Sequence, residues 1–258
     1  TRRSSDLLFL AHEHRMFDTL GVDVRLRRYN AQMDCDTAFR GTTVEGIVSD
    51  LVRTERFQQQ GIGLKYVAGT VQHWQLIASK RSRVSRLDQL GDKVVGITRF
   101  SGTDWLTNQC LEGVKVKGDV YRVQINDVLI RLRMLIGNEI DAAWLSEPWA
   151  TLARQRGGVV LVDSSDRYPV LGVIAFKDEA IRDKRRQKQL SLFLKGYNMA
   201  CDSLNAHGLS AYVDVLKKYY RIDDKTIAAL PKIRYMHAVE PTADNIKKVS
   251  AFVKTTIN

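Results

Sequence analysis

The stretch that decides the fold of this chain is IGNEIDAAWLSEPW, residues 136–149. Gly137 and Asn138 suit the left-handed conformation that closes a helix, and residues 140–145 form an apolar run short enough for a buried strand. Pro148 suits the first turn of a second helix. We therefore predict helix, turn, buried strand and helix, with Glu147 at the carboxyl end of the strand, where open α/β sheets bind ligands. A purely structural connection fits this stretch alone equally well.

Strand and helix patterns alternate outward from this stretch. Apolar residues recur at helical spacing over residues 7–20, and Gly21 stands where that helix would be capped. The next segment, VDVRLRRY (22–29), alternates apolar and polar side chains, as a half-buried strand does. Further predicted elements are a helix at 34–43, a strand at 45–50, a helix at 51–60 and a strand at 64–70. The alternation predicts a parallel or mixed sheet covered by helices on both faces.

A second lobe begins after HWQLIASK (73–80). Its predicted elements are strands at 93–98, 119–125 and 141–145, with helices starting near residues 102, 128 and 148. The nearly unbroken apolar strand YPVLGVIAF (168–176) would return to the first lobe, and the remainder from about residue 178 is mostly helical. We expect an α/β fold of two lobes, one formed by residues 1–78 and 172–258 and the other by residues 79–171.

Composition describes an ordinary globular chain. Its 258 residues are 44% hydrophobic and 27% charged, enough apolar material to bury one large or two modest cores. No apolar run approaches the roughly 20 residues of a membrane span. The apolar stretch within TRRSSDLLFLAHEH (1–14) is too short for a signal peptide. Cys35, Cys110 and Cys201 lie far apart, which argues against a disulfide framework and a structural zinc site.

The formal net charge of +11 raises the question of nucleic-acid binding. The basic residues are spread along the whole chain, and no helix-turn-helix, zinc-finger or RNP-like pattern accompanies them. We therefore expect no nucleic-acid partner. A general positive field would still steer an anionic solute or an anionic membrane surface towards the protein.

The order of these motifs resembles a known family, the nitrate, sulfonate, taurine and thiamine-pyrimidine solute-binding proteins of ABC importers. The similarity is carried, from one end of the chain to the other, by MFDTLGVDVRL (16–26), SRLDQLGDKVVGI (85–97), IGNEIDAAWLSEPW (136–149), and GGVVLVDSS (157–165) followed by VLGVIAFKDE (170–179).

This resemblance implies the type II periplasmic-binding-protein fold, in which two α/β lobes joined by two crossover strands close over a ligand. It also implies an ABC permease as membrane partner, a monomer, and a periplasmic or lipid-anchored location. Members of the family begin with a strand ahead of the first helix, whereas this sequence starts directly at TRRSS. The expected cleft loops here carry Arg2, Arg3, Ser4 and Ser5, and TRFSGT (98–103).

The loop ITRFSGTDW (97–105) is the best anion site in the sequence. Ser101 and Thr103 offer hydroxyl groups, Gly102 lets a ligand approach the backbone, and the first N–H groups of the helix carry partial positive charge. Arg99 would add a bidentate contact to a sulfonate, phosphate or carboxylate. The alternative is an ordinary helix cap with Arg99 in solvent, and Asp104 favours it because its carboxylate would repel an anion.

The other candidate ligand residues come from several loops. Trp74 would stack on a planar ring or pack as hinge core, and Asp50 would accept from a ligand amine or cap the following helix. Tyr168 would close over the ligand or cover the hinge. The full candidate set is Ser4, Asp50, Gln72, His73 and Trp74 on one lobe, and Arg99, Ser101, Gly102, Thr103, Asn126, Glu147 and Tyr168 on the other.

Catalysis has little support in the sequence. His12 and His14 flank Glu13, but the spacing is not HExxH and the two rings would point to different sides of a helix, so we expect neither a metal nor a cofactor. No GxSxG, P-loop or GxGxxG occurs. The alternatives are an enzyme on the same fold, of menaquinone-pathway or pyrimidine-synthase type, and the effector domain of a LysR-type regulator. A small organic anion is the expected ligand, against an amine-bearing ring stacked on Trp74.

Overall fold

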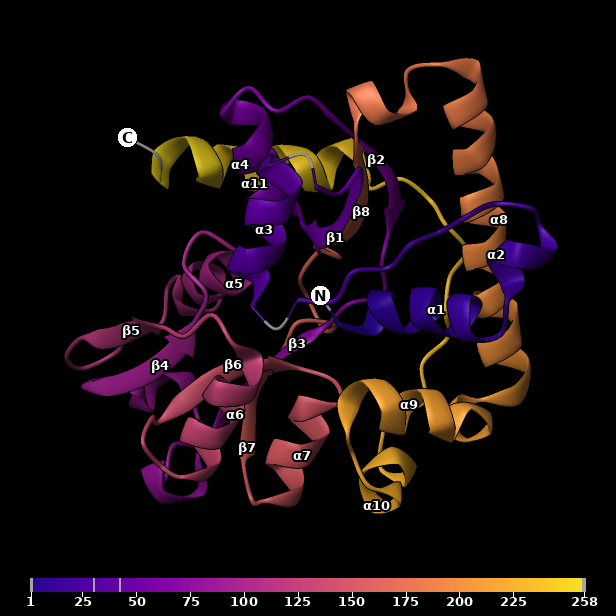
Figure 1. Ribbon diagram of the computed structural model, residues 1–258. Coiled ribbons are helices and arrows are strands. Elements are labelled where there is room, and N and C mark those ends of the chain that lie inside the picture. The colour runs from indigo at the N-terminus through magenta and orange to yellow at the C-terminus, as the bar shows by residue number, and fades with distance from the viewer. Residues whose placement is uncertain (1, 30, 42, 257–258) are drawn as a thin grey trace.

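The computed structural model describes residues 2–29, 31–41 and 43–256, with side chains from Asp6 onward. Its strands form two separate sheets, each covered by helices, as Figure 1 shows with the smaller sheet above and the larger sheet below. The predicted α/β fold with two lobes is confirmed.

The smaller sheet has the order β1-β8-β2. Its strands are β1 (Gly46–Asp50), β8 (Gly172–Lys177) and β2 (Leu64–Gly69), and both neighbours run antiparallel to β8. Apolar side chains alternate between its faces: Ile47 packs with α4 (Leu51–Gln59) and α11 (Ala243–Thr256), while Ile174 packs with α1 (Arg2–Glu13) and α8 (Lys184–His207). The sheet is therefore buried on both faces.

The larger sheet has the order β5-β4-β6-β3-β7. Strand β4 runs parallel to β5 and β6, and β3 runs antiparallel to β6 and β7. The bounds are β3 (Trp74–Ala78), β4 (Lys93–Ile97), β5 (Val120–Gln124), β6 (Ala142–Ser146) and β7 (Val159–Asp163). The helices that connect its strands are α5 (Gly102–Leu111), α6 (Val128–Ile136) and α7 (Trp149–Gln155).

The stretch 136–149 adopts the predicted sequence of elements. Helix α6 ends at Ile136, Asn138 takes a left-handed φ of 59°, and β6 follows as a fully buried strand. Pro148 is the N-cap of α7. The chain leaves the smaller sheet after β2 and returns to it at β8, so the two connections between the sheets are residues 70–73 and 164–171. By its hydrogen bonds, β3 belongs with the larger sheet.

Two predicted elements differ from the structure. The helix expected over residues 7–20 is broken at Arg15, whose φ of 54° separates α1 from α2 (Met16–Thr19). Residues 22–29, predicted to be a strand, alternate in burial as far as Arg27, but they form no strand and no described strand pairs with them. That prediction was wrong because a strand requires a neighbour for its backbone groups as well as the right side-chain pattern.

The remaining helices are α3 (Gln32–Arg40), α9 (Val213–Tyr220) and α10 (Asp224–Ala228). Helices α9 and α10 pack against Trp149 of α7 through Leu216 and Tyr220 of α9 and Ile227 of α10. The C-terminal helices therefore contact both lobes. Short 3-10 turns lie at Lys80–Ser82, Leu87–Leu90, Asp178–Ile181 and Leu209–Tyr212. Over the described part of the chain, every helix is too short or too polar to cross a bilayer.

Candidate functional site

A hollow of about 760 Å³ opens between the two sheets and continues along the edge of β1. Side chains of both lobes line it. Six of the predicted ligand residues are among them: Asp50 from the end of β1, Gln72 from the first connection, and Trp74, Ser101, Thr103 and Asn126 from the larger lobe. The inter-lobe position predicted for the site therefore coincides with a real hollow.

Asp50 joins the two lobes through a single carboxylate oxygen. As the N-cap of α4, its Oδ1 accepts from the Arg53 backbone N–H at 3.1 Å, and it also accepts from the Gly102 N–H of α5 at 2.9 Å. The side chain is buried, and burial raises the pKa of Asp50 to about 6 against the hydrogen bonds that favour the charged form. Asp50 is thus a cap for helices of both lobes.

The predicted anion cradle at the start of α5 is already satisfied by groups of the chain itself. Asp50 takes the Gly102 N–H, the Ser101 hydroxyl accepts from the Thr103 N–H at 3.2 Å, and the Ser101 carbonyl accepts from the next two N–H groups. The Thr103 hydroxyl accepts from the Thr98 N–H at 3.0 Å. An anion bound at this helix end would have to displace the Asp50 carboxylate.

Arg131 of α6 contributes a buried positive charge to the wall of the larger lobe. Its guanidinium donates to the carbonyls of Ile125 and Trp144 and to the Thr98 hydroxyl, all neutral acceptors. None of the ion pairs formed by the described residues includes it. Burial lowers the pKa of Arg131 to about 10, so the group stays charged at neutral pH. The hydrogen-bond acceptors of this buried cation are thus neutral, while the carboxylate of Asp127 favours its charged form.

Gln72 and Trp74 add an acceptor and an aromatic ring to the lining. Gln72 is buried in the first connection, and its Oε1 has no hydrogen-bond partner among the described groups. Trp74 is buried at the start of β3, in the larger sheet, where its backbone N–H donates to the Ser164 hydroxyl at 2.8 Å. Both residues line the hollow, which therefore holds an unused amide oxygen and an indole ring.

Five other predicted residues lie outside the lining. Arg99 is exposed with its guanidinium 5.9 Å from the Phe100 ring, and Tyr168 packs edge-on against Trp105. Glu147 turns towards α7, where it accepts from the Thr151 N–H and from Arg154, each at 2.9 Å. His73 and Gly102 border the lining residues without belonging to them. The side chain of Ser4 lies outside the described residues.

Sequence reasoning missed several lining residues, chiefly Thr98, Arg131, Trp144 and Ser146. Arg131 carried a signal, since it falls on the buried face of α6 beside Leu132 and Leu135, where a lone arginine needs a reason. Trp144 and Ser146 lie in a strand that reads simply as core. Ser146 ends this strand, at the edge that the sequence predicts to bind a ligand, whereas nothing in the sequence distinguishes Trp144 from the core.

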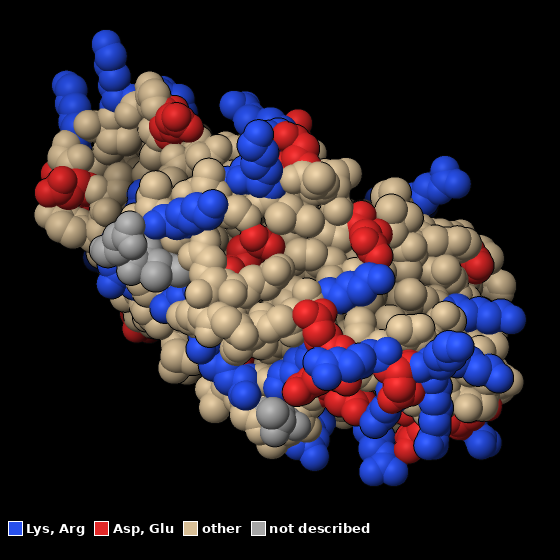
Figure 2. All heavy atoms as spheres, turned by 90° about the horizontal axis from the view of Figure 1, so that it is seen from above, with Lys and Arg blue, Asp and Glu red and all other residues tan. Residues whose placement is uncertain are grey.

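The exposed charge is mixed rather than gathered. Figure 2 shows Lys and Arg interspersed with Asp and Glu over the upper face of the molecule. Within the part of the chain that the structure describes, no group of three or more His, Cys, Asp or Glu side chains is placed to hold a metal ion.

Comparison with known proteins gives matches in structure only. No family model matches this sequence, and no curated protein matches it. The alkanesulfonate-binding protein SsuA from Xanthomonas axonopodis pv. citri superposes with a TM-score of 0.78 at 14% identity, covering 97% of this chain and 88% of that one. SsuA from Escherichia coli gives 0.78 at 14% identity, covering 98% and 90%.

The periplasmic nitrate-binding protein NrtA from Synechocystis PCC 6803 gives a TM-score of 0.77 at 10% identity, covering 98% of this chain and 77% of that one. These likenesses extend over nearly the whole chain and match the family that the sequence resembles. At such identities they establish the fold, which is that of a periplasmic binding protein.

Proposed function

We propose that this chain is the solute-binding component of an ABC importer, which captures a small solute between its lobes and presents it to a membrane permease. The observation that carries the proposal is the hollow between the lobes, with Asp50 and Gln72 on one wall and Ser101, Thr103 and Arg131 on the other. Polar groups from both sides bind one ligand only when the lobes are together, so the ligand stabilises the closed form.

The comparisons support this class of function. The similar structures include binding proteins for alkanesulfonates and nitrate and a ligand-binding component of an import system from Staphylococcus aureus. The proposed location is extracytoplasmic, periplasmic or lipid-anchored, and the protein acts as a monomer. The proposed lobes are residues 1–78 with 172–258, and residues 79–171. Strand β3 (Trp74–Ala78) is the exception, because it is hydrogen-bonded in the larger sheet and would move with the second lobe.

The proposed solute is a small organic anion, such as a sulfonate or a carboxylate. Arg131 supports this choice because its buried charge has only neutral acceptors, and a charge-assisted contact from guanidinium to an anion is strong. The overall charge of +11 would help to attract the solute. Asp50 opposes an anion until its carboxylate leaves α5, so ligand entry and release of the Asp50 contact are coupled.

The alternative solute is an amine-bearing ring. Trp74 would offer a ring for stacking, Gln72 an unused acceptor and Asp50 a carboxylate, and all three line the hollow. The enzyme alternative would need a nucleophile or an acid–base pair in the hollow, where the described lining offers the carboxylates of Asp23, Glu45 and Asp50 and the thiol of Cys35. The regulator alternative would require a DNA-binding unit, which is a separate module.

Calorimetric titration tests the proposal with three probe sets: alkanesulfonates, nitrate and aminopyrimidines. We expect binding of at least one sulfonate, and loss of that binding when Arg131 is replaced. If only aminopyrimidines bind, the proposed solute is the amine-bearing ring and not the anion, and the proposed importer function is unaffected. Binding of no member of any set by a folded protein, with turnover of none, would count against the function itself.

A further inference from the structure

Three arginines lie outside the solute hollow, where α4 of the smaller lobe meets α5 of the larger lobe. The guanidinium carbon of Arg56 in α4 lies 4.3 Å from the centroid of the Phe100 ring, which belongs to the other lobe. The guanidinium carbon of Arg99 lies 5.9 Å from the same centroid. Arg40, the last residue of α3, lies over the ring of Phe57, the neighbour of Arg56 in α4. These three arginines form an arginine cluster that draws on both lobes.

The arginine cluster has no acidic partner. None of the ion pairs among the described residues includes any of its three members. By contrast, Arg53, one turn before Arg56 in α4, is paired with Asp36. Arg40 donates to the amide oxygen of Gln60, whereas Arg56 is half-buried and none of its side-chain nitrogens donates to a described residue. Donors of the cluster are therefore left for a ligand.

The cationic groups of the cluster disfavour one another. Burial lowers the pKa of Arg56, and the positive charge of Arg40 lowers it further. The Asp104 carboxylate lies in the adjoining helix turn, but one of its oxygens accepts from the Phe100 N–H at 2.9 Å and the other lies 3.4 Å from Arg122. An anion bound at the cluster would offset this repulsion.

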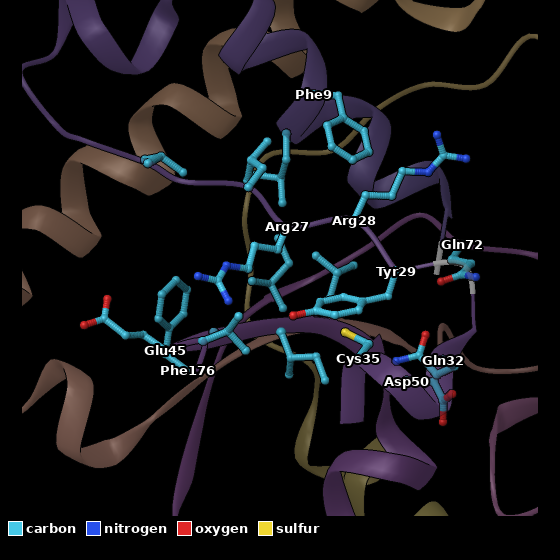
Figure 3. A pocket seen from close by; sticks show the side chains of 18 of the residues that line it. Phe9, Arg27, Arg28, Tyr29, Gln32, Cys35, Glu45, Asp50, Gln72 and Phe176 are labelled. Carbon is cyan, nitrogen blue, oxygen red and sulfur yellow. The ribbon is translucent and has the colours of Figure 1, made fainter. Parts of the chain in front are cut away.

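The arginine cluster is separate from the solute hollow. Among the described residues that line the hollow, none belongs to the cluster, and Phe100 is not one of them either. Figure 3 shows the hollow with Gln32, Asp50 and Gln72 at one side of the view and Phe176 at the other. An ion at the cluster would therefore contact both lobes without occupying the space of the solute.

We propose that Arg56 of the smaller lobe and Arg99 of the larger lobe bind one free phosphate or sulfate ion across the lobe junction, with Arg40 adding positive charge beside it. Guanidinium groups bind such oxyanions through paired N–H donors. The ion would hold α4 and α5 together and so favour the closed form. This coupling rests on the proposed function: the ion would tighten solute binding, and by linkage the solute would tighten binding of the ion.

Calorimetric titration with inorganic phosphate, in chloride buffer of constant ionic strength and without solute, tests the ion site itself. We expect Arg56→Gln and Arg99→Gln each to weaken phosphate binding by about tenfold or more, because each loses hydrogen bonds between charged groups. Arg133→Gln is the matched control, since it removes an exposed cation of α6 and should leave phosphate binding unchanged. Arg131→Gln should also leave it unchanged, because Arg131 faces the solute hollow.

Several results would overturn the proposal. They are no binding of phosphate by the native chain, equal losses in Arg56→Gln, Arg99→Gln and Arg133→Gln, and a loss confined to Arg131→Gln, which would place phosphate in the solute hollow. Sedimentation with phosphatidylglycerol vesicles that requires Arg56 and Arg99 would overturn the assignment to a free ion, because the phosphate would then belong to a lipid. Arg99 is exposed, so Arg99→Gln keeps the test valid if thermal unfolding shows that Arg56→Gln is unstable.

Sulfonate titrations with and without phosphate test the coupling. Phosphate should tighten sulfonate binding by the native chain about fivefold or more and should have no effect on Arg99→Gln. In chloride buffer without phosphate, Arg99→Gln should bind the sulfonate as the native chain does. Unchanged or weaker sulfonate binding in phosphate would overturn the closing role of the ion. Phosphate binding that requires Arg56 and Arg99, in a chain that binds no solute of any set, would count against the proposed function alone.

Discussion

The carboxylate of Asp50 and the backbone N–H of Gly102 meet at 2.9 Å, and this hydrogen bond joins α4 of one lobe to α5 of the other. The same oxygen also caps α4 by accepting from the Arg53 N–H, so one carboxylate oxygen serves both the helix cap and the contact between the lobes. The sequence predicts that an anion binds at the start of α5. In the structure, the Asp50 carboxylate occupies that position. Asp50 would therefore compete with the proposed anionic solute for the start of α5.

Replacing Asp50 with Asn tests this competition. The amide keeps an acceptor oxygen for the two N–H groups but removes the negative charge beside the proposed anion. We expect Asp50→Asn to bind a sulfonate at least about fivefold more tightly, on the order of 1 kcal/mol, as measured by calorimetry. Asp88→Asn, at an exposed surface pair with Arg86, is the matched control and should leave affinity unchanged. Weaker sulfonate binding by Asp50→Asn would mean that the carboxylate assists the ligand.

The raised pKa of Asp50 makes stability depend on pH. Its ordinary pKa is 3.8 and burial raises the folded pKa to about 6, so the folded state holds the proton more tightly than the unfolded state does. The stabilisation from protonated Asp50 is complete below pH 3.8 and is lost as the pH rises through 6. The unfolding free energy of the native chain minus that of Asp50→Asn, from urea titrations, should fall between about pH 4 and pH 6. A difference that stays constant over this range would contradict the assignment.

Arg131 is expected to carry the charge that binds the anion. Arg131→Lys keeps a cation but loses the planar fork, and Arg131→Gln removes the charge. We expect Arg131→Gln to cost about 1.5 to 3 kcal/mol of sulfonate affinity, with Arg131→Lys in between. Arg99→Gln is the control, because Arg99 is a nearby but exposed cation and its loss should change affinity little. Thermal unfolding of each variant separates lost binding from lost fold. Equal losses of sulfonate affinity in Arg99→Gln and Arg131→Gln would mean that the overall positive charge of the protein, and not a direct contact with Arg131, attracts the solute.

Gly102 allows the lobes to approach each other. A Cβ there would lie 3.2 Å from Leu171 Cδ1 and 3.5 Å from Asp50 Cβ, so alanine is tolerated with a small shift while a branched side chain is not. We expect Gly102→Val to hold the lobes apart and increase the radius of gyration in X-ray scattering, with Gly102→Ala close to the native value. An unchanged radius in a folded Gly102→Val protein would show that this contact does not set the closure.

The fold could be predicted largely because its signals are local. The turn at Asn138, the buried run of β6 and the helix start at Pro148 each depend on residues a few positions apart. Residues 22–29 show the limit: their alternating side chains are right for a strand, but strand pairing depends on a neighbour elsewhere in the chain.

The site was predicted less completely for the same reason. Ser101 and Thr103 are identifiable from the loop that carries them. The opposition of Asp50 to the start of α5 arises only when the two lobes are brought together. The burial of Arg131 among the carbonyls of Ile125 and Trp144 arises from the packing of the larger lobe, between residues that are distant in the sequence.

The most direct test of the account is a crystal structure of the protein with the tightest-binding solute from the calorimetric series. We predict solute density between the lobes, in contact with Arg131, Ser101 or Trp74 of the larger lobe and with Gln72 of the first connection. If that solute is an anion, we predict that the Asp50 carboxylate is withdrawn from the Gly102 N–H. Density outside this hollow, with Arg131 and Trp74 remote from it, would contradict the proposed function and its site.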